Sequence, residues 1–370
     1  MSTDVAADDD PVLDPERQRL AKQYGRQRRA LLVAGVFLAL VYAVAWQIGL
    51  SRGQLHVLSA GAIIVLFAVI VVGWEIVSLP NDWIGYQLSR GYGLSTQSAG
   101  SWLADKLKAL GLLILLGGGM VELTYLFMRL QPAWWWLQDA GVLLLVTVLL
   151  ANLAPVLIAP LFFKFTPLED AELTERLLEL VRKAGTRVRG VFTMHLSEKT
   201  TAANAALMGW GNTRRIVVGD TLADNFTHDE TEAVLAHELG HHVHHDIWRA
   251  IALQSIATVA GLWLTNVCCG GLQAAGWLGA LHDAQDMPAI GLLFGFWTAV
   301  FTPLTNWASR VAERHADEYA LAMATRPKAF AASMIRLANQ NLAEVDPPRW
   351  VEVLLYDHPA IQRRIRLLEE

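Results

Sequence analysis

Apolar residues along the 370-residue chain gather into six long stretches that are separated by polar segments. An α-helix needs about 20 consecutive apolar residues to cross the hydrocarbon core of a bilayer. Each of the stretches reaches that length. The pattern therefore predicts six transmembrane helices, at residues 30–50, 56–79, 109–128, 137–160, 250–270 and 287–307.

Residues 164–249, between the fourth and fifth stretches, have the pattern of a soluble α+β unit. The segment TPLEDAELTERLLELVRKAG predicts an amphipathic helix that begins near Thr166 or Glu169, with an apolar face made of Leu173, Leu177, Leu178 and Val181. GVFTMHLSEK and RRIVVGD have the composition of two short strands. The fold class that follows is a mostly α-helical polytopic membrane protein with a small β-sheet in its soluble part.

A second helix is predicted within THDETEAVLAHELGHHVHHD, at the end of this soluble unit. Thr227 or Asp229 can cap its first turn, and Val234, Leu235 and Leu239 supply apolar positions. The stretch also holds five histidines within nine residues, which makes it the chemically richest part of the chain.

The composition agrees with a membrane protein. Hydrophobic residues make up 54% of the chain and charged residues only 18%, whereas soluble proteins are about one quarter charged. The net charge of −5 gives no reason to expect a nucleic-acid partner. Cys268 and Cys269 are adjacent in an apolar stretch and cannot form a disulfide framework. Residues 1–29 lack the short apolar region and cleavage site of a signal peptide.

Lysine and arginine positions predict the orientation in the membrane. Six basic residues lie between positions 17 and 29, directly before the first span, so the N-terminus is expected in the cytoplasm. Six crossings then leave only Arg52 and Arg129 in the outer loops. The predicted organisation is a disordered, basic cytosolic tail (1–29), four spans (30–163) with a cytosolic loop (80–108), a cytosolic protease unit (164–249), two spans (250–307) and a cytosolic C-terminal part (308–370).

A metal-binding pattern lies in the second soluble helix. His237 and His241 are four residues apart, so their imidazoles project from one helix face and can reach the same zinc ion. Glu238 lies beside that face and can take a proton from water that zinc has made acidic. These three residues form a complete H-E-x-x-H motif.

A catalytic zinc ion usually has three protein ligands, and the third must come from elsewhere in the chain. NWASRVAERHADEYALAMA, after the sixth span, predicts a helix with Glu313 and Asp317 on one face. Glu313 can complete the site, and Asp317 can orient a ligand histidine. The same residues also fit an ordinary charged helix with Arg310 and Arg314 as partners. Spacing alone does not choose between the two interpretations.

Other polar residues near these features have simpler interpretations. We predict that His242, His244 and His245 are solvated at the cytoplasmic face of the membrane and are not metal ligands. Glu75 and Glu122 interrupt predicted spans, where they either line a polar path or reach the headgroups.

Several motifs, taken in order, resemble the integral-membrane CAAX prenyl protease family. They are P-L-F-x-K-F-T-P-L at 160–168, N-A-x-x-x-G at 204–209, R-I-V-V-x-D-T-L at 215–222, H-E-L-G-H at 237–241, S-R-x-x-E-x-x-A-D at 309–317 and a His-Pro pair followed by Arg at 358–364. The similarity runs from about residue 80 to 366. This family consists of multispan zinc metalloendopeptidases of the gluzincin type with a zincin-like protease domain.

The resemblance implies one zinc ion per chain and assigns the residues that serve it. The implied ligands are His237, His241 and Glu313, with Glu238 as the general base and Asp317 behind a ligand histidine.

It also implies how a peptide or membrane-protein substrate is held. Asn204 and the stretch AANAALMG would form an edge strand that pairs with an extended substrate backbone. His358 and Arg364 would face the scissile carbonyl or the substrate chain. The pair His358-Pro359 also fits the simple start of a helix.

The chain departs from the eukaryotic members, because it has six predicted spans where they have seven. We expect a protein of the bacterial inner membrane, and because bacteria generally lack protein prenylation, a prenylated substrate is the least transferable property. One alternative is a bacterial quality-control protease of the heat-shock type, although the chain length and P-L-F-F-K-F-T-P-L favour the CAAX branch. Another is a non-catalytic scaffold or transporter with a vestigial site, which the intact ligands and base disfavour.

Overall fold

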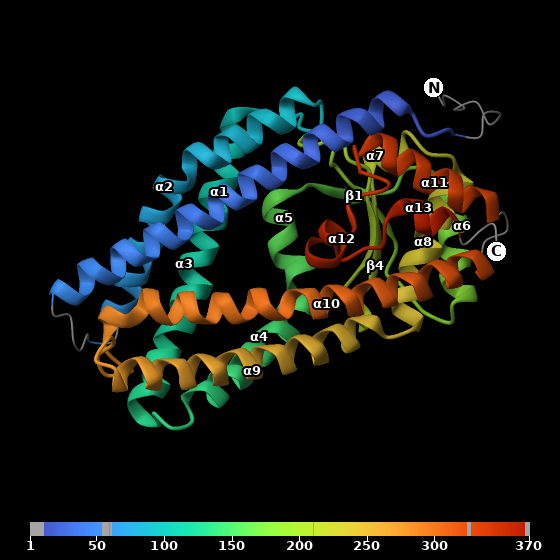
Figure 1. The fold of residues 1–370 in the computed structure, drawn as a ribbon. Coiled ribbons are helices and arrows are strands. Elements are labelled where there is room, and N and C mark those ends of the chain that lie inside the picture. Colours follow the sequence, from blue (N-terminus) through green and yellow to red (C-terminus); the bar gives the residue numbers. More distant parts are fainter. Residues whose placement is uncertain (1–10, 54–58, 60, 210, 324–326, 367–370) are drawn as a thin grey trace.

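The computed structural model describes residues 11–53, 59, 61–209, 211–323 and 327–366 (Figure 1). The first ten residues of the predicted disordered tail lie outside this part. Within it, six helical segments are long and apolar enough to span a membrane, as predicted. They are α1 (Pro15–Gly53), α2 (Ala62–Gly91), α3 (Ala99–Leu130), α4 (Trp135–Leu153) with its continuation η1 (Ala154–Ile158) and α5 (Ala159–Phe162), α9 (Asp246–Ala274), and α10 (Met287–Met323).

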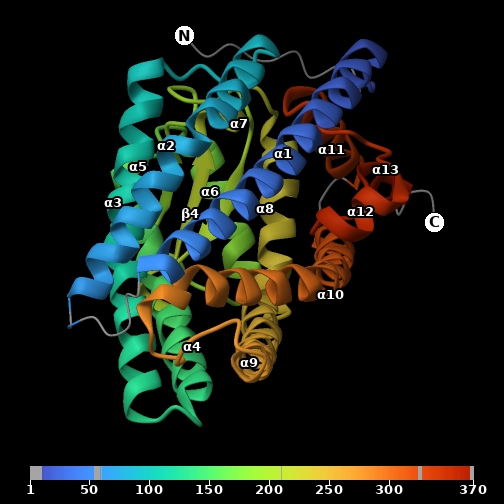
Figure 2. The same cartoon turned by 60° about the vertical axis from the view of Figure 1, so that its left-hand side comes forward.

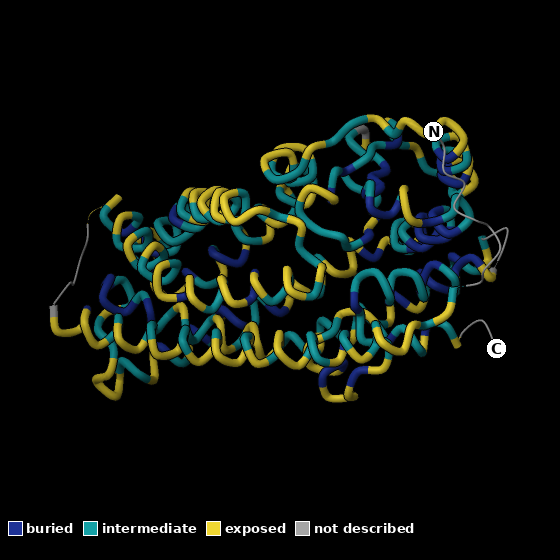
Figure 3. Tube along the Cα trace, turned by 90° about the horizontal axis from the view of Figure 1, so that it is seen from above, coloured by how far each residue is buried: buried dark blue, intermediate teal, exposed yellow. Residues whose placement is uncertain are grey.

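The six long helices pack in a closed ring. Each contacts two others, in the order α1, α2, α3, α4, α9, α10 and back to α1 (Figures 1 and 2). Large apolar side chains are exposed along their surfaces, among them Phe37, Ile76, Leu115 and Ile256. Exposed positions, drawn in yellow, recur along the long helices in Figure 3. Exposed apolar surface of this extent marks contact with lipid.

Several helices extend beyond the apolar stretches that predict them. Helix α1 begins at Pro15, so the basic segment before the first span is helical. This segment also has partners: Arg17 Nε donates to the carbonyl of Asn339 (2.8 Å), and Arg29 forms an ion pair with Glu344 (3.2 Å). The N-terminal helix therefore packs against the C-terminal part of the chain.

The small sheet lies at one end of the helical ring (Figure 1). Its strands are β1 (Phe165–Pro167), β2 (Val191–Met194), β3 (Ala205–Met208) and β4 (Arg215–Gly219), in the order β1-β2-β4-β3. The central β2 and β4 are parallel and correspond to the two predicted strands, while β1 and β3 add antiparallel edges. The strand around AANAALMG is thus an edge strand.

Short helices complete the unit around the sheet. They are α6 (Ala171–Lys183), η2 (Gly211–Thr213), α7 (Asp220–Ala223), α8 (His228–Val243), α11 (Pro327–Gln340), α12 (Arg349–Leu355) and α13 (Ile361–Arg366), while η3 (Ala284–Asp286) precedes α10. Thr227 caps α8 as predicted, in a capping box with Glu230. Asp170 caps α6, so the helix begins beside Glu169, the second of the two predicted positions, whereas Thr166 belongs to β1.

A shared apolar core fixes α8 on the sheet. Leu173 and Leu177 from α6, Ile216 from β4 and Leu235 and Leu239 from α8 are all buried in one cluster. Burial of a leucine or isoleucine side chain contributes about 1.5–3 kcal/mol. This core holds the histidine-bearing helix firmly in place.

Helices α8 and α10 approach each other unusually closely. A Cβ atom at Gly240 would lie only 2.8 Å from the Cα of Ala316, and Ala316 is fully buried. Real Cβ atoms are not found this close to backbone, so only glycine allows the two helices to pack at this distance. Helix α10 runs unbroken from the membrane span to this contact.

We predict that Gly240→Ala destabilises the protein. Alanine normally stabilises a helix by about 1 kcal/mol relative to glycine, but here its methyl group must push two backbones apart, and overpacking costs about 1–3 kcal/mol. Thermal unfolding of the full chain in detergent should show a lower midpoint. Gly270→Ala is the matched control, since a Cβ at Gly270 meets nothing within 4 Å. Equal midpoints for the two variants would contradict the proposed constraint.

Candidate metal centre

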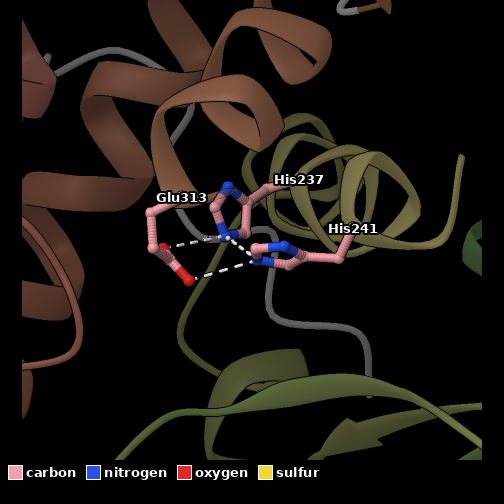
Figure 4. Close-up of side chains that lie close together, drawn as sticks. All are labelled: His237, His241 and Glu313. Atoms are coloured by element: carbon pink, nitrogen blue, oxygen red, sulfur yellow. Dashed lines mark hydrogen bonds and ion pairs between the residues drawn. The ribbon is translucent and has the colours of Figure 1, made fainter. Parts of the chain in front are cut away.

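His237, His241 and Glu313 converge at the α8–α10 contact. The two histidines project from α8 and the glutamate from α10, and their rings and carboxylate face one another (Figure 4). His237 and Glu313 are buried, with 6% and 4% of their surfaces exposed. The structure thus brings together the three residues that the sequence predicts as ligands.

The spacing of the donor atoms suits a zinc-sized ion. His237 Nε2 lies 3.2 Å from His241 Nε2 and 3.4 Å from Glu313 Oε2, and His241 Nε2 lies 3.2 Å from Glu313 Oε1. Tetrahedral coordination with bonds of about 2.0–2.1 Å places neighbouring ligand atoms roughly 3.3–3.4 Å apart. The three side chains already have the separation that such coordination requires.

Carboxylates hold both imidazoles in the orientation needed for metal binding. Asp317 Oδ1 lies 2.8 Å from His237 Nδ1, and Asp246 Oδ2 lies 3.0 Å from His241 Nδ1. When each Nδ1–H donates to its carboxylate, Nε2 presents its lone pair. Both lone pairs then point at the same place, an arrangement that a cation stabilises.

Asp246 was not predicted from the sequence. It is the first residue of α9 and reaches His241 because His245 adopts a left-handed conformation (φ 57°) between the two helices. The available signal was a single acidic residue that closes the histidine run HHVHHD. The contact of Asp246 with His241 depends on a sharp turn at His245 that the residue types do not predict.

The electrostatics of the site also favour a cation. Glu313 Oε2 is buried and has no hydrogen-bond partner, although buried polar atoms normally have one. Burial by itself lowers the pKa of His237, but the neighbouring carboxylates of Asp317 and Glu313 outweigh this effect and raise that pKa to about 9. The donor set therefore fits a divalent metal ion.

Glu238 and His358 both adjoin this cluster, and each lines a different cavity. Glu238 is partly buried and lines a cavity together with His241, and burial raises the pKa of its carboxyl group. His358 Nε2 lies 3.2 Å from Glu313 Oε1, while its Nδ1 hydrogen-bonds to Asp357 (2.8 Å), which raises the pKa of His358. The His358 side chain is 54% exposed, and its contact with a substrate stays a prediction.

Arg364 is buried beside the same cluster. Its Nε and Nη2 donate to the two carboxylate oxygens of Asp317, at 2.9 and 2.7 Å, and Nη2 is 3.4 Å from His237 Nδ1. Only 7% of Arg364 is exposed. The predicted contact of Arg364 with substrate stays a prediction. Its pairing with Asp317 was not indicated by the sequence.

Asn204 is exposed and directly precedes the edge strand β3. Its carbonyl accepts a hydrogen bond from the backbone N–H of Gly219 (2.8 Å), so it continues the pairing of β3 with β4. Leu207 and Gly209, farther along this edge, line the same cavity as Glu238. The edge strand thus runs beside the predicted catalytic residues.

The three additional histidines do not belong to the metal-binding group. His242 Nε2 lies 3.1 Å from Thr186 Oγ1, His244 donates to the carbonyl of Gly240, and His245 is exposed. The intramembrane acids also have partners. Glu75 pairs with Lys106 (2.9 Å), and Glu122 accepts a hydrogen bond from the backbone of Gly61 (3.2 Å).

Comparison with known proteins agrees with this geometry. Residues 167–370, more than half of the chain, match the model of peptidase family M48. The chain belongs to peptidase family M48. Residues 24–164 match the CAAX prenyl protease N-terminal model, whose description names five membrane helices. The described residues in that range form four helices of spanning length, so the M48 protein differs there.

Relatives of this M48 protein include metalloproteases from bacteria and eukaryotes. It is 29% identical to the uncharacterized metalloprotease YhfN of Bacillus subtilis, over 98% of this chain and 88% of the relative. It is 27% identical to CAAX prenyl protease 1 of Saccharomyces cerevisiae, over 80% and 69% of the respective chains. The protein is therefore a multi-pass membrane metalloprotease.

A solved structure has the same fold. The crystal structure of S. mikatae Ste24p aligns with a TM-score of 0.81 at 22% sequence identity, covering 96% of this chain and 89% of that one. The shared fold, with its long helices and small sheet, therefore covers nearly the whole molecule.

We predict that both carboxylates behind the histidines contribute to metal binding. Asp246→Asn and Asp317→Asn should each lower metal affinity about 10–100-fold, as is typical when a carboxylate–histidine pair is broken. Competition with a fluorescent zinc chelator measures this in the purified full chain. Glu318→Gln, an exposed acid beside Asp317 on α10, is the control and should bind metal normally. Unchanged affinity in both aspartate variants would refute the assignment.

Proposed function

We propose that this M48 protein is a zinc endopeptidase whose ion is held by His237, His241 and Glu313. The observation that carries the proposal is the triangle of donor atoms 3.2–3.4 Å apart, with both histidines oriented by carboxylates. Two imidazoles and one carboxylate are a usual protein ligand set for catalytic zinc. One zinc ion per chain follows from the single such group among the described residues.

Glu238, His358 and Arg364 have different roles in the proposed hydrolysis of the peptide bond. Zinc, when bound, acts as a Lewis acid and makes water a nucleophile near neutral pH. Glu238 takes a proton from the attacking water and delivers it to the leaving amine, and its raised pKa suits both transfers. His358 donates a hydrogen bond to the oxygen that becomes negative during attack. Arg364 holds Asp317 in place, and β3 binds the substrate backbone by strand addition.

The substrate is proposed to be a membrane-associated peptide or protein. Support comes from the metal centre at the end of the helical ring and from the relatives named CAAX prenyl protease 1. The match of residues 24–164 favours a CAAX-type protease over a quality-control protease of the heat-shock type. A requirement for a lipid on the substrate is not part of the proposal.

We further propose that the active site faces the cytoplasm of a bacterium. The basic residues that set orientation lie on the same side as residues 164–249 and 308–370, which form the protease unit. The similarity to the Bacillus subtilis protein supports a bacterial cell membrane, which in a Gram-negative organism is the inner membrane.

Replacement of Glu238 separates catalysis from metal binding. Glu238→Gln should retain one zinc ion per chain but lose activity by about 10²–10⁴-fold, because the amide cannot accept the proton. Zinc content by mass spectrometry and cleavage of quenched fluorescent peptides provide the two readouts. Glu318→Gln serves as the control. Full peptidase activity in a zinc-loaded Glu238→Gln protein would exclude the proposed mechanism.

His358→Ala tests stabilisation of the developing charge. We expect kcat to fall on the order of 10²–10³-fold, as when an oxyanion donor is removed, with KM changed far less. Zinc content should stay at one per chain, since His358 is outside the ligand group. If His358 only begins a helix, the variant will have altered thermal stability and an unchanged kcat.

A further inference from the structure

A cavity of about 270 Å³ lies directly beside the metal centre. Glu238 and His241 line it on one side, and Leu207 and Gly209 of the edge-strand region line it on another. Its volume is below the roughly 300–1,000 Å³ of sites that enclose small-molecule ligands. It is therefore suited to one side chain or one chain end of a peptide that lies along β3.

The lining of this cavity has two parts. One wall is apolar and comes from the ends of α4 and α9, with Val148, Ala151, Ile247, Trp248 and Ile251. The other part carries basic groups, namely Arg214, His242 and His245. The only acidic lining residue is Glu238, which already serves the metal centre in the proposed mechanism.

Arg214 is held in place without a carboxylate. Its Nη1 donates to Thr186 Oγ1, and the same hydroxyl oxygen lies 3.1 Å from His242 Nε2. No ion pair to Arg214 is found among the described residues, and burial lowers its pKa, which reflects a cation that is partly removed from water. A partly buried, uncompensated cation is costly unless a ligand supplies the opposite charge.

The adjacent Arg215 differs from Arg214 in the contacts that its guanidinium group makes. Its Nη2 donates to the carbonyl of Pro155, and its guanidinium lies 4.9 Å from the ring centre of Phe165 and 5.7 Å from that of Phe192. Arg215 is thus occupied by contacts that tie the sheet to the end of α4 and η1. Arg214, one residue earlier, faces the cavity beside the metal centre instead.

We propose that Arg214 binds a carboxylate of the substrate and sets a preference for a negative charge near the scissile bond. A guanidinium presents donors in a planar fork that matches a carboxylate, while the apolar wall packs against the methylene groups of the same residue. The carboxylate belongs either to an aspartate or glutamate side chain or to the C-terminus of the substrate. This inference rests on the proposed peptidase function.

Two peptide series separate the sources of the carboxylate. In the first, a single glutamate or glutamine occupies each position from three residues before to three residues after the scissile bond, and both peptide ends are blocked. In the second, otherwise neutral peptides end one to four residues after the scissile bond, as a free acid or as an amide. The zinc-loaded full chain in detergent is assayed for kcat/KM with each.

The wild-type protein should prefer the negative member at one position by about 10–100-fold, the usual effect of a hydrogen-bonded charged pair. The responding series identifies the source. Arg214→Gln should abolish the preference, Arg214→Lys should retain part of it, and Arg214→Glu should favour lysine at that position. Arg187→Gln is the control, because Arg187 is an exposed arginine outside the cavity.

The possible results distinguish this inference from the proposed function. If the wild-type protein cleaves neutral peptides but shows no charge preference, the peptidase function stands and the role of Arg214 is refuted. A preference that persists in Arg214→Gln and Arg214→Glu refutes it equally. If Arg214→Gln loses activity on all peptides alike and also loses zinc or thermal stability, Arg214 is structural and the inference fails. Absence of any cleavage by the zinc-loaded wild type refutes the proposed function itself.

Discussion

The close contact of α8 with α10 at Gly240 and Ala316 is the constraint on which the candidate metal centre depends. Two histidines on one helix cannot bind a catalytic metal without a third ligand, and that ligand belongs to a distant part of the sequence. The absence of a side chain at Gly240 lets the backbones approach until Glu313 and Asp317 meet His237. The glycine of H-E-L-G-H is thus a packing requirement of the site.

The continuity of α10 connects this contact to the membrane. One helix from Met287 to Met323 contains both the apolar span and the two acids, so the position of the spans fixes the position of the proposed ligand Glu313. On the other side, α8 is held by the apolar core of the sheet, α6 and α11. The buried charges between the helices are paired: Arg364 binds Asp317, and Asp317 binds His237. Removal of either Arg364 or Asp317 would leave the buried charge of the other without its partner.

The sequence predicted the features that depend on local pattern. Hydropathy gave six spans, and the spacing of His237 and His241 placed both imidazoles on one helix face. Glu313 became a firm candidate only through resemblance, because spacing across two spans carries no information about contact. Asp246 was missed because its contact with His241 needs the left-handed turn at His245. The pairing of Arg364 with Asp317 was also missed, since it joins the last short helix to α10 through tertiary packing alone.

The proposed metal chemistry and the proposed substrate selection are assigned to different sets of residues. The proposed ligands and base belong to α8 and α10. A buried core and a backbone contact fix the positions of these two helices, so we expect substitutions there to disturb the site. The cavity beside them is bounded by the β3 edge, by Arg214 before β4 and by the ends of α4 and α9. Leu207, Arg214 and Trp248, which line this cavity, are outside the metal-binding group. Because Arg214 and the apolar wall are separate from the proposed ligands, a change of the proposed charge preference does not require a change of those ligands.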